Sequence, residues 1–247
     1  NEKYPLAKIH INCGIYIIQD KKDEVFTDAL DNARYARRSI NEDYRSVIAV
    51  YNEIMRRRVE EDARVIPVFE EALEKGNIEL YFQPKFAIDT QQLIGAEVLS
   101  RIYDSEGNMM LPSVYIPVLE KTGLISHLDD YVIRHLIDEM REWEEKQLDY
   151  PVISVNMSRV DFIEPDFLKK IDEYVEEKKV PKSKLEFELT ETTFCENFQL
   201  IVEKIEWLRS QGYRISMDDF GTGYNSLDVL GTVSVDVVKF DRAFVLH

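Results

Sequence analysis

The sequence predicts an α/β barrel preceded by a smaller α+β unit, and three observations support this fold class. From Ile78 onward, strand-like runs alternate with helical segments, as in α/β folds. Each run has an apolar face and a face with polar groups near its C-terminal end. Strands covered by helices are buried on both faces, so such polar groups suit a barrel interior with a reaction site at its mouth. The first fifty residues follow a separate pattern of strand, helix and strand.

The small unit begins with a predicted half-buried strand, in which isoleucines and Cys13 at positions 9 to 17 alternate with other residues. A helix is predicted from about Glu24 to Arg38, followed by a short strand from Val47 to Tyr51. A charged helix then runs from about Glu53 to Glu74. We expect Pro67 to kink or restart this helix, and Gly76 with Asn77 to end it.

The barrel strands and helices follow in alternation along the rest of the chain. The predicted strands are Glu79 to Gln83, Ile94 to Arg101, Val152 to Ser158, Leu185 to Thr190, Tyr213 to Asp218 and Val235 to Lys239. The predicted helices are Val114 to Thr122, Asp129 to Lys146, Asp166 to Lys178 and Phe198 to Ser210.

Composition limits the classes of function. The 247 residues include 47 acidic and 31 basic side chains, and the net charge of −16 argues against binding long nucleic acid. An anionic substrate would need metal ions or a few placed cations. No run approaches the roughly 18 apolar residues of a membrane span, and the start lacks an apolar signal core. The two cysteines form neither a disulfide framework nor a zinc site, so we expect a cytoplasmic protein, with any membrane anchor upstream.

The most informative local feature is the adjacent pair Asp218 and Asp219, which ends an apolar run and opens into a glycine-bracketed turn. Paired carboxylates repel each other unless cations lie between them, which suggests a metal site. The alternative is a solvated junction between strand and loop, because Asp and Gly are ordinary turn residues.

Strand periodicity predicts which other polar residues lie near the two aspartates. Alternate side chains of a strand point to opposite faces, so Glu97 shares a face with Leu99 and Arg101, whereas Ala96 and Val98 share the other. The same reasoning collects one set of polar residues from different strand ends: Glu97, Asn156, Glu188, Asp218, Asp219 and Lys239.

This set predicts metal-assisted hydrolysis, most simply of a phosphate ester. Oxygen ligands suit Mg²⁺ or Mn²⁺ and not zinc. Lys239 shares its strand face with Val235 and Val237, which favours an inward ammonium over a solvated edge residue. An inward lysine beside metal ions could position or deprotonate a water molecule.

Residues from about Tyr81 to the C-terminus resemble the EAL domain, the family of cyclic-di-GMP phosphodiesterases named for a Glu-Ala-Leu signature. Six segments carry the resemblance in the family's order and spacing: Tyr81-Phe-Gln-Pro-Lys85, Gly95-Ala-Glu-Val-Leu-Ser-Arg101, Ser154-Val-Asn-Met-Ser158, Glu188-Leu-Thr-Glu191, Asp218-Asp-Phe-Gly-Thr-Gly-Tyr224 and Val238-Lys-Phe-Asp-Arg242.

The resemblance implies a modified TIM (β/α)8 barrel whose first strand runs antiparallel to its neighbours. It implies that two divalent ions, Mg²⁺ or Mn²⁺, are held by Glu97, Asn156, Glu188, Asp218 and Asp219, with Asp218 bridging them. Lys239 falls on the lysine that contacts the attacking water. The implied reaction is in-line attack on one phosphodiester bond, opening cyclic-di-GMP to linear pGpG.

Other family positions concern substrate and loop. Gln83, Leu99 and Arg101 fall on substrate-contacting positions, where a guanidinium is suited to a phosphate. Glu191 falls on the carboxylate that steadies the loop beginning at Asp219. The resemblance also implies a possible homodimer formed near residues 219 to 226.

Two departures from the family pattern stand out. The signature reads Glu97-Val98-Leu99, and Val98 lies on the outward face, so its extra methyls should affect helix packing more than chemistry. The chain ends at His247, before the family's last two strands, which carry a further metal-ligand glutamate and a substrate-contacting glutamine. We therefore expect an incomplete barrel in this chain.

The opening residues resemble the end of a GGDEF domain, through Ile11-Asn-Cys-Gly-Ile15 and Ala29-Leu-Asp-Asn-Ala-Arg-Tyr-Ala36. The predicted organisation is residues 1–52 as the C-terminal part of this GGDEF-like domain, 53–77 as a linker helix and 78–247 as the EAL domain. Expected partners are cyclic-di-GMP and upstream GGDEF-like or sensor domains. The alternative to an active phosphodiesterase is a catalytically inactive EAL domain that binds cyclic-di-GMP as a receptor.

Overall fold

The structure is a computed structural model that describes residues 11–18, 26–40, 47–195, 197–221 and 230–241. The chain divides into two compact units, Asn1–Arg64 and Val65–His247. The division falls inside helix α2 (Glu53–Lys75), whereas the boundaries predicted from the sequence lie at the two ends of this helix. Those predicted boundaries remain a prediction.

The first unit contains two short parallel strands, β1 (Cys13–Ile15) and β2 (Ile48–Val50), with helix α1 (Phe26–Arg38) between them in the chain. The glycine of β1 explains how close α1 comes, because a Cβ on Gly14 would lie 1.9 Å from the Ala33 carbonyl oxygen. The helix therefore contacts the Gly14 face of the strand. The alternating isoleucines mark the opposite face, and Ile11 and Ile15 are 66% and 38% exposed.

Helix α2 is one continuous helical segment that includes Pro67, so of the two predicted effects, a kink or a restart, the restart does not occur. Its buried side chains are Val65, Phe69 and Ala72, which recur at helical spacing. Gly76, at φ 71°, follows the end of the helix as predicted. None of the described helices combines the length and apolar content that a membrane-spanning segment needs.

The second unit is built on a seven-stranded sheet, in which β3, β4, β6, β7, β8 and β9 are successive neighbours. The bounds are β3 (Ile78–Phe86), β4 (Leu93–Tyr103), β5 (Met109–Met110), β6 (Val152–Asn156), β7 (Leu185–Thr190), β8 (Arg214–Phe220) and β9 (Val237–Phe240). Strand β3 is antiparallel to β4, and the pairings from β4 through β9 are parallel. The antiparallel first strand confirms that expectation.

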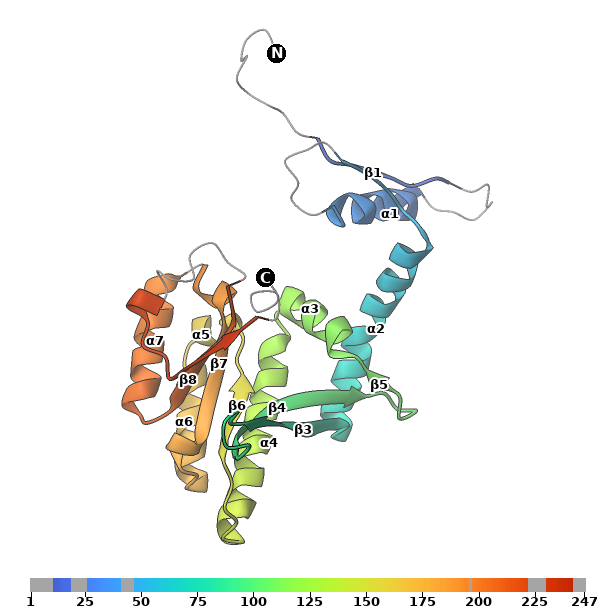
Figure 1. The fold of residues 1–247 in the computed structure, drawn as a ribbon. Helices are drawn as coiled ribbons and strands as arrows, with labels where there is room; N and C mark the ends of the chain where they lie inside the picture. The colour runs from blue at the N-terminus through green and yellow to red at the C-terminus, as the bar shows by residue number, and fades with distance from the viewer. Residues whose placement is uncertain (1–10, 19–25, 41–46, 196, 222–229, 242–247) are drawn as a thin grey trace. The chain divides into compact units, whose positions relative to one another are not determined.

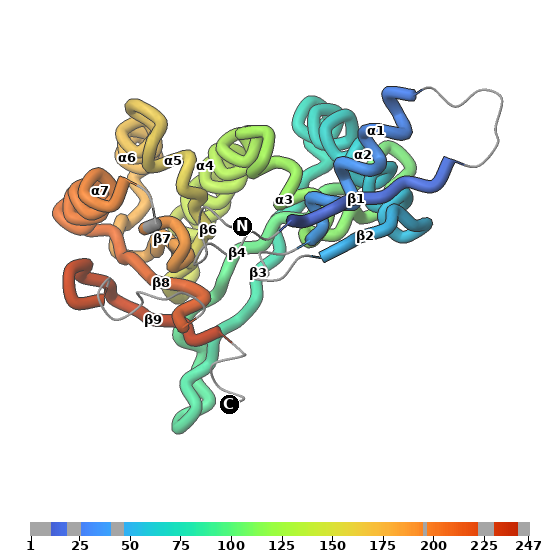
Figure 2. Tube along the Cα trace, turned by 90° about the horizontal axis from the view of Figure 1, so that it is seen from above, coloured from blue at the N-terminus to red at the C-terminus, as the bar shows by residue number. Residues whose placement is uncertain are grey.

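Helices cover the outer side of this sheet, which curves through an arc when it is seen from above (Figure 2). Their bounds are α3 (Pro112–Thr122), α4 (Ile125–Glu145), α5 (Arg159–Ile163), α6 (Phe167–Lys178) and α7 (Phe198–Ser210), with 3-10 turns η1 (Lys182–Lys184) and η2 (Glu191–Cys195). Figure 1 shows how strands β6 to β8 alternate with these helices along the chain, as the sequence pattern predicted.

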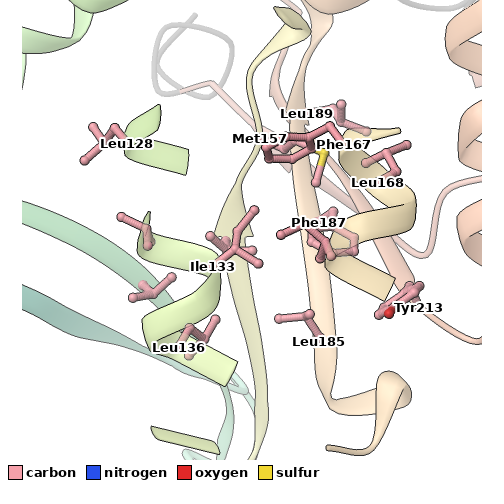
Figure 3. Close-up of a cluster of buried hydrophobic side chains, with 14 of the residues drawn as sticks. Leu128, Ile133, Leu136, Met157, Phe167, Leu168, Leu185, Phe187, Leu189 and Tyr213 are labelled. Carbon is pink, nitrogen blue, oxygen red and sulfur yellow. The ribbon is translucent and has the colours of Figure 1, made fainter. Parts of the chain in front are cut away.

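The apolar core lies between the helices and the outward face of the strands (Figure 3). Leu185, Phe187 and Leu189 of β7 are buried there, together with Leu136 of α4 and Leu168 of α6. The predicted outward residues Ala96 and Val98 are also buried, at 7% and 2% exposure. The strands are therefore buried on the helix side, and their other face points into the barrel.

Candidate active site

The ammonium of Lys239 joins three carboxylates from three other strands. Lys239 Nζ lies 2.9 Å from Glu97 Oε2, 2.8 Å from Glu188 Oε2 and 2.9 Å from Asp218 Oδ2. Strands β9 and β4 are not neighbours in the sheet order, so this contact requires the sheet to curl. The four side chains lie on the inward face, where strand periodicity predicts them.

The ion pairs are largely shielded from water. The Glu188 side chain is fully buried, and the side chains of Glu97 and Lys239 are 15% and 25% exposed. Burial alone would lower the pKa of Lys239, but hydrogen bonds to Glu188, Asp218 and Glu97 outweigh it and raise that pKa. Burial likewise acts to raise the pKa of Glu188, but hydrogen bonds from Lys239, Lys85 and Ser154 lower it. The cluster therefore favours charged groups.

Asn156 and Asp219 flank this cluster. The Asn156 amide donates to Glu97 Oε1 at 2.9 Å, which brings the last residue of β6 beside the β4 carboxylate. Asp219 is exposed and has a positive φ of 56°, and its backbone N–H donates to Asp218 Oδ1 at 2.8 Å. Burial, and then the charges of Asp218 and Asp241, raise the pKa of Asp219. Repulsion between the aspartates, expected from the sequence, is thus present in the structure.

The three carboxylates Glu97, Glu188 and Asp218 form a group that could hold a metal ion, with one oxygen from each lying within 4.8 Å of the others. Within the described residues Asp219 is not part of this group. A donor set made of carboxylate and amide oxygens suits a hard divalent cation. The residues present therefore fit the cofactor that the sequence suggested.

Glu191 begins η2, directly after β7, and contacts the turn that follows β8. Its Oε2 accepts the backbone N–H of Gly221 at 3.2 Å, and Gly221 has a positive φ of 101° that suits glycine. The glutamate is buried at 6% exposure. It therefore fixes the turn two residues after Asp219, although the loop from residue 222 to 229 lies outside the described residues.

A cavity of about 500 Å³ opens beside the cluster and is lined by Leu99, Arg101, Asn156 and Glu188, among others. The Arg101 guanidinium lies 5.5 Å from the centre of the Tyr81 ring and donates to its neighbour's carbonyl, Ser100 O. Gln83 is not among the lining residues, but β3 places it directly opposite Glu97 in the strand register. The predicted substrate-contacting residues thus lie on strands β3 and β4 at one side of the cluster.

Sequence reasoning missed two groups of polar residues. Lys85 Nζ donates hydrogen bonds to Glu188 Oε1 and Ser154 Oγ and lies near Glu186 Oε1. Asp129 of α4 and Asp161 of α5 are buried together, and both accept the backbone N–H of Ser158. Burial and then the charge of Asp161 raise the pKa of Asp129 well above its ordinary value. Lys85 lies in the segment Tyr81-Phe-Gln-Pro-Lys85, which carries part of the family resemblance, whereas the burial of Asp129 with Asp161 depends on packing between helices.

Comparisons with known proteins show which family the chain resembles. The EAL domain family profile matches residues 68–247. The chain is 33% identical over 178 residues to "Signaling protein YkoW" of Bacillus subtilis (strain 168), covering 72% of this chain and 22% of the relative. It is 30% identical over 176 residues to "Probable cyclic di-GMP phosphodiesterase PdeB" of Escherichia coli (strain K12), covering 71% of this chain and 34% of the relative.

The solved structure described as "PaMucR Phosphodiesterase, c-di-GMP complex" matches with a TM-score of 0.68 and 30% identity, over 74% of each chain. The two curated relatives are much longer than the region they share with this chain, which spans about a fifth to a third of their length. Because the family profile covers well over half of the residues, with the barrel and its inward carboxylates inside the match, this chain belongs to the EAL domain family.

Proposed function

We propose that this protein hydrolyses one phosphodiester bond of cyclic-di-GMP and releases linear pGpG. The observation that carries the proposal is the convergence of Glu97, Glu188, Asp218 and Lys239 inside the barrel, beside a cavity that Arg101 lines. Membership of the EAL family supports it, as do similar proteins whose names describe phosphodiesterases of this nucleotide.

In this proposal two divalent ions, Mg²⁺ or Mn²⁺, are the cofactors. Glu97, Asn156, Glu188 and Asp218 would hold one, with Asp218 shared and Asp219 serving the second. Bound there, such ions activate water and neutralise charge on the phosphate. The protein's own net charge of −16 makes this help necessary, because the substrate is anionic.

Lys239 would act as a hydrogen-bond donor that orients the attacking water. Hydrogen bonds to Glu188, Asp218 and Glu97 raise its pKa, which favours the protonated ammonium as a donor. Arg101 would contact a phosphate of the substrate, and Gln83 and Leu99 would contact the rest of it. The tyrosine ring beside Arg101 limits where the guanidinium can point. Glu191 would hold the turn that carries Asp219.

The test is to incubate the full-length protein with cyclic-di-GMP and Mn²⁺ or Mg²⁺ and to separate the products by chromatography. The proposal predicts pGpG from the wild type and none from Glu97→Ala, with both proteins folded by circular dichroism. Tight nucleotide binding without product would instead support a catalytically inactive receptor. Turnover retained in Glu97→Ala would reject the assignment of Glu97 as a metal ligand.

We also propose a cytoplasmic location, upstream GGDEF-like or sensor domains in the same polypeptide, and a homodimer formed near residues 219 to 226. Similarity to much longer signalling proteins supports the presence of further domains. Light scattering of the full-length protein tests the dimer, and a monomer at micromolar concentration would reject it.

A further inference from the structure

Lys85 places a second ammonium against the metal-ligand candidate Glu188. Its Nζ donates to Glu188 Oε1 at 2.7 Å and to Ser154 Oγ at 2.7 Å, and lies 3.8 Å from Glu186 Oε1. The Lys85 side chain is 29% exposed, whereas those of Glu186 and Glu188 are 5% and 0% exposed. This cation therefore sits among groups that have almost no access to water.

The two lysines divide the oxygens of Glu188 between them. Lys239 donates to Oε2 and also to Glu97 Oε2 and Asp218 Oδ2, whereas Lys85 donates to Oε1. A divalent ion held by the three carboxylates would compete with Lys239 for its position. Lys85 would not be displaced, because it approaches Glu188 from the other oxygen. It is then the cation that stays on Glu188.

Local backbone structure directs Lys85 to this position. In the antiparallel ladder Lys85 lies opposite Gly95, and Gln83 lies opposite Glu97. Lys85 is therefore on the same face of β3 as Gln83, two residues farther along the strand, and its side chain enters the barrel. The register shifts between Lys85 and Phe86, as at a β-bulge, which re-aims side chains. A Cβ on Gly95 would lie 3.6 Å from Lys85 Cδ and 3.2 Å from the Val152 carbonyl oxygen, so glycine leaves the lysine stem its room.

We propose that Lys85 is a positioning residue, which holds Glu188 in the orientation that presents Oε2 to the metal site. The inference rests on the proposed function, because that function gives Glu188 its ligand role. Outer partners of metal ligands fix ligand orientation, and their loss commonly weakens metal binding by about 10- to 100-fold. Simple electrostatics predicts the reverse, since removing a nearby positive charge should make a divalent cation bind more tightly.

The test is calorimetric titration of Mn²⁺ into the full-length protein, without nucleotide, comparing wild type with Lys85→Met. We expect the dissociation constant of the variant to rise by about 10- to 100-fold. Unchanged or tighter Mn²⁺ binding by the folded variant would overturn the proposal, because charge alone would then explain the contact. Lys85→Arg keeps a positively charged hydrogen-bond donor and should therefore bind Mn²⁺ more tightly than Lys85→Met. If both variants lost the same Mn²⁺ affinity relative to wild type, the positioning role would be contradicted.

Lys182 provides the matched control. It is a lysine of similar burial, with an 18% exposed side chain, and it too pairs with two carboxylates, Asp172 and Glu176. It lies at η1, just before β7, and outside the cluster. Lys182→Met should leave the Mn²⁺ dissociation constant unchanged, and an equal loss in this control would show that the effect at Lys85 is one of general stability and would overturn the proposal.

Two provisions keep the result decisive. If Lys85→Met does not fold, Lys85→Gln provides a polar neutral replacement, and it should also weaken Mn²⁺ binding, with wild-type affinity overturning the proposal. The Mn²⁺ dissociation constant is measured without nucleotide, so it does not depend on catalysis. If wild type makes no pGpG but Lys85 variants still lose Mn²⁺ affinity, the proposed function fails while the positioning role stands.

Discussion

Replacing Lys239 by methionine tests the electrostatic design of the site. The change keeps a long unbranched side chain but removes the ammonium that joins three carboxylates at 2.8 to 2.9 Å. Glu97, Glu188 and Asp218 would then face each other without the cation between them. Without a metal ion, we expect the variant to be markedly less stable than the wild type.

The magnitude follows from burial. Removing one partner of a buried ion pair costs about 3–5 kcal/mol, because it leaves an uncompensated charge. The Lys239 and Asp218 side chains are 25% and 23% exposed, so water relieves part of this cost and we take the lower end, about 3 kcal/mol. For a domain of this size about 1 kcal/mol corresponds to roughly 2–4 °C in Tm, which predicts a decrease of about 6–12 °C.

The assay is thermal unfolding in EDTA, and then with added Mn²⁺. Because the ammonium no longer competes for the carboxylates, Mn²⁺ should stabilise Lys239→Met by a larger shift in Tm than it does the wild type. A variant as stable as wild type in EDTA would refute the reasoning, since the three contacts would then contribute nothing. An equal Mn²⁺ shift in both proteins would show that Lys239 does not compete with the ion.

Three further predictions concern other parts of the molecule. Asp129→Asn should raise the free energy of unfolding by about 1 kcal/mol near pH 8, because an amide can donate to Asp161 and carries no charge. Burial raises the pKa of Asp129 in the wild type, so the ionised carboxylate destabilises the folded state fully above its native pKa, and this cost disappears as pH falls towards the ordinary value of 3.8. Melting from pH 8 to 4.5 should therefore show a shrinking stability difference between Asp129→Asn and wild type, and a constant difference would contradict the prediction. Glu191→Ala removes the acceptor of the Gly221 N–H and should cost about 1–3 kcal/mol locally, seen as faster hydrogen exchange of that amide, whereas unchanged exchange would count against a holding role. Gly14→Ala should force α1 away from β1 and reduce the order of the first unit in NMR spectra, and an unaltered spectrum would show that the close approach is not needed.

Much of the barrel was predictable, because side chains of a strand alternate with a period of two. That rule put Glu97 and Val98 on opposite faces, and the expectation of a barrel interior made the polar face the inward one, as the structure has it. It could not say which face of an isolated strand is covered. In β1 the helix packs on the face of Gly14, where a Cβ would clash with the Ala33 carbonyl oxygen.

The missed residues have physical reasons too. The predicted first strand ends at Gln83 and so leaves out Lys85, whereas the structure extends β3 through Pro84 to Phe86. Proline is tolerated in an edge strand, and β3 is at the edge of the described sheet. The Asp129 and Asp161 pair joins α4 to α5, and no local pattern indicates that two helical carboxylates will be buried together.

The most direct test of the account is a comparison of cyclic-di-GMP turnover by wild type and Glu188→Gln in Mn²⁺, with pGpG measured by chromatography. Glu188 is the buried carboxylate that both lysines hold, and glutamine keeps its size while removing its charge. The account predicts pGpG from wild type, its loss in EDTA, and at least about a 100-fold lower rate in the folded variant. Wild-type turnover by Glu188→Gln would contradict the claim that this inward cluster is the catalytic metal site.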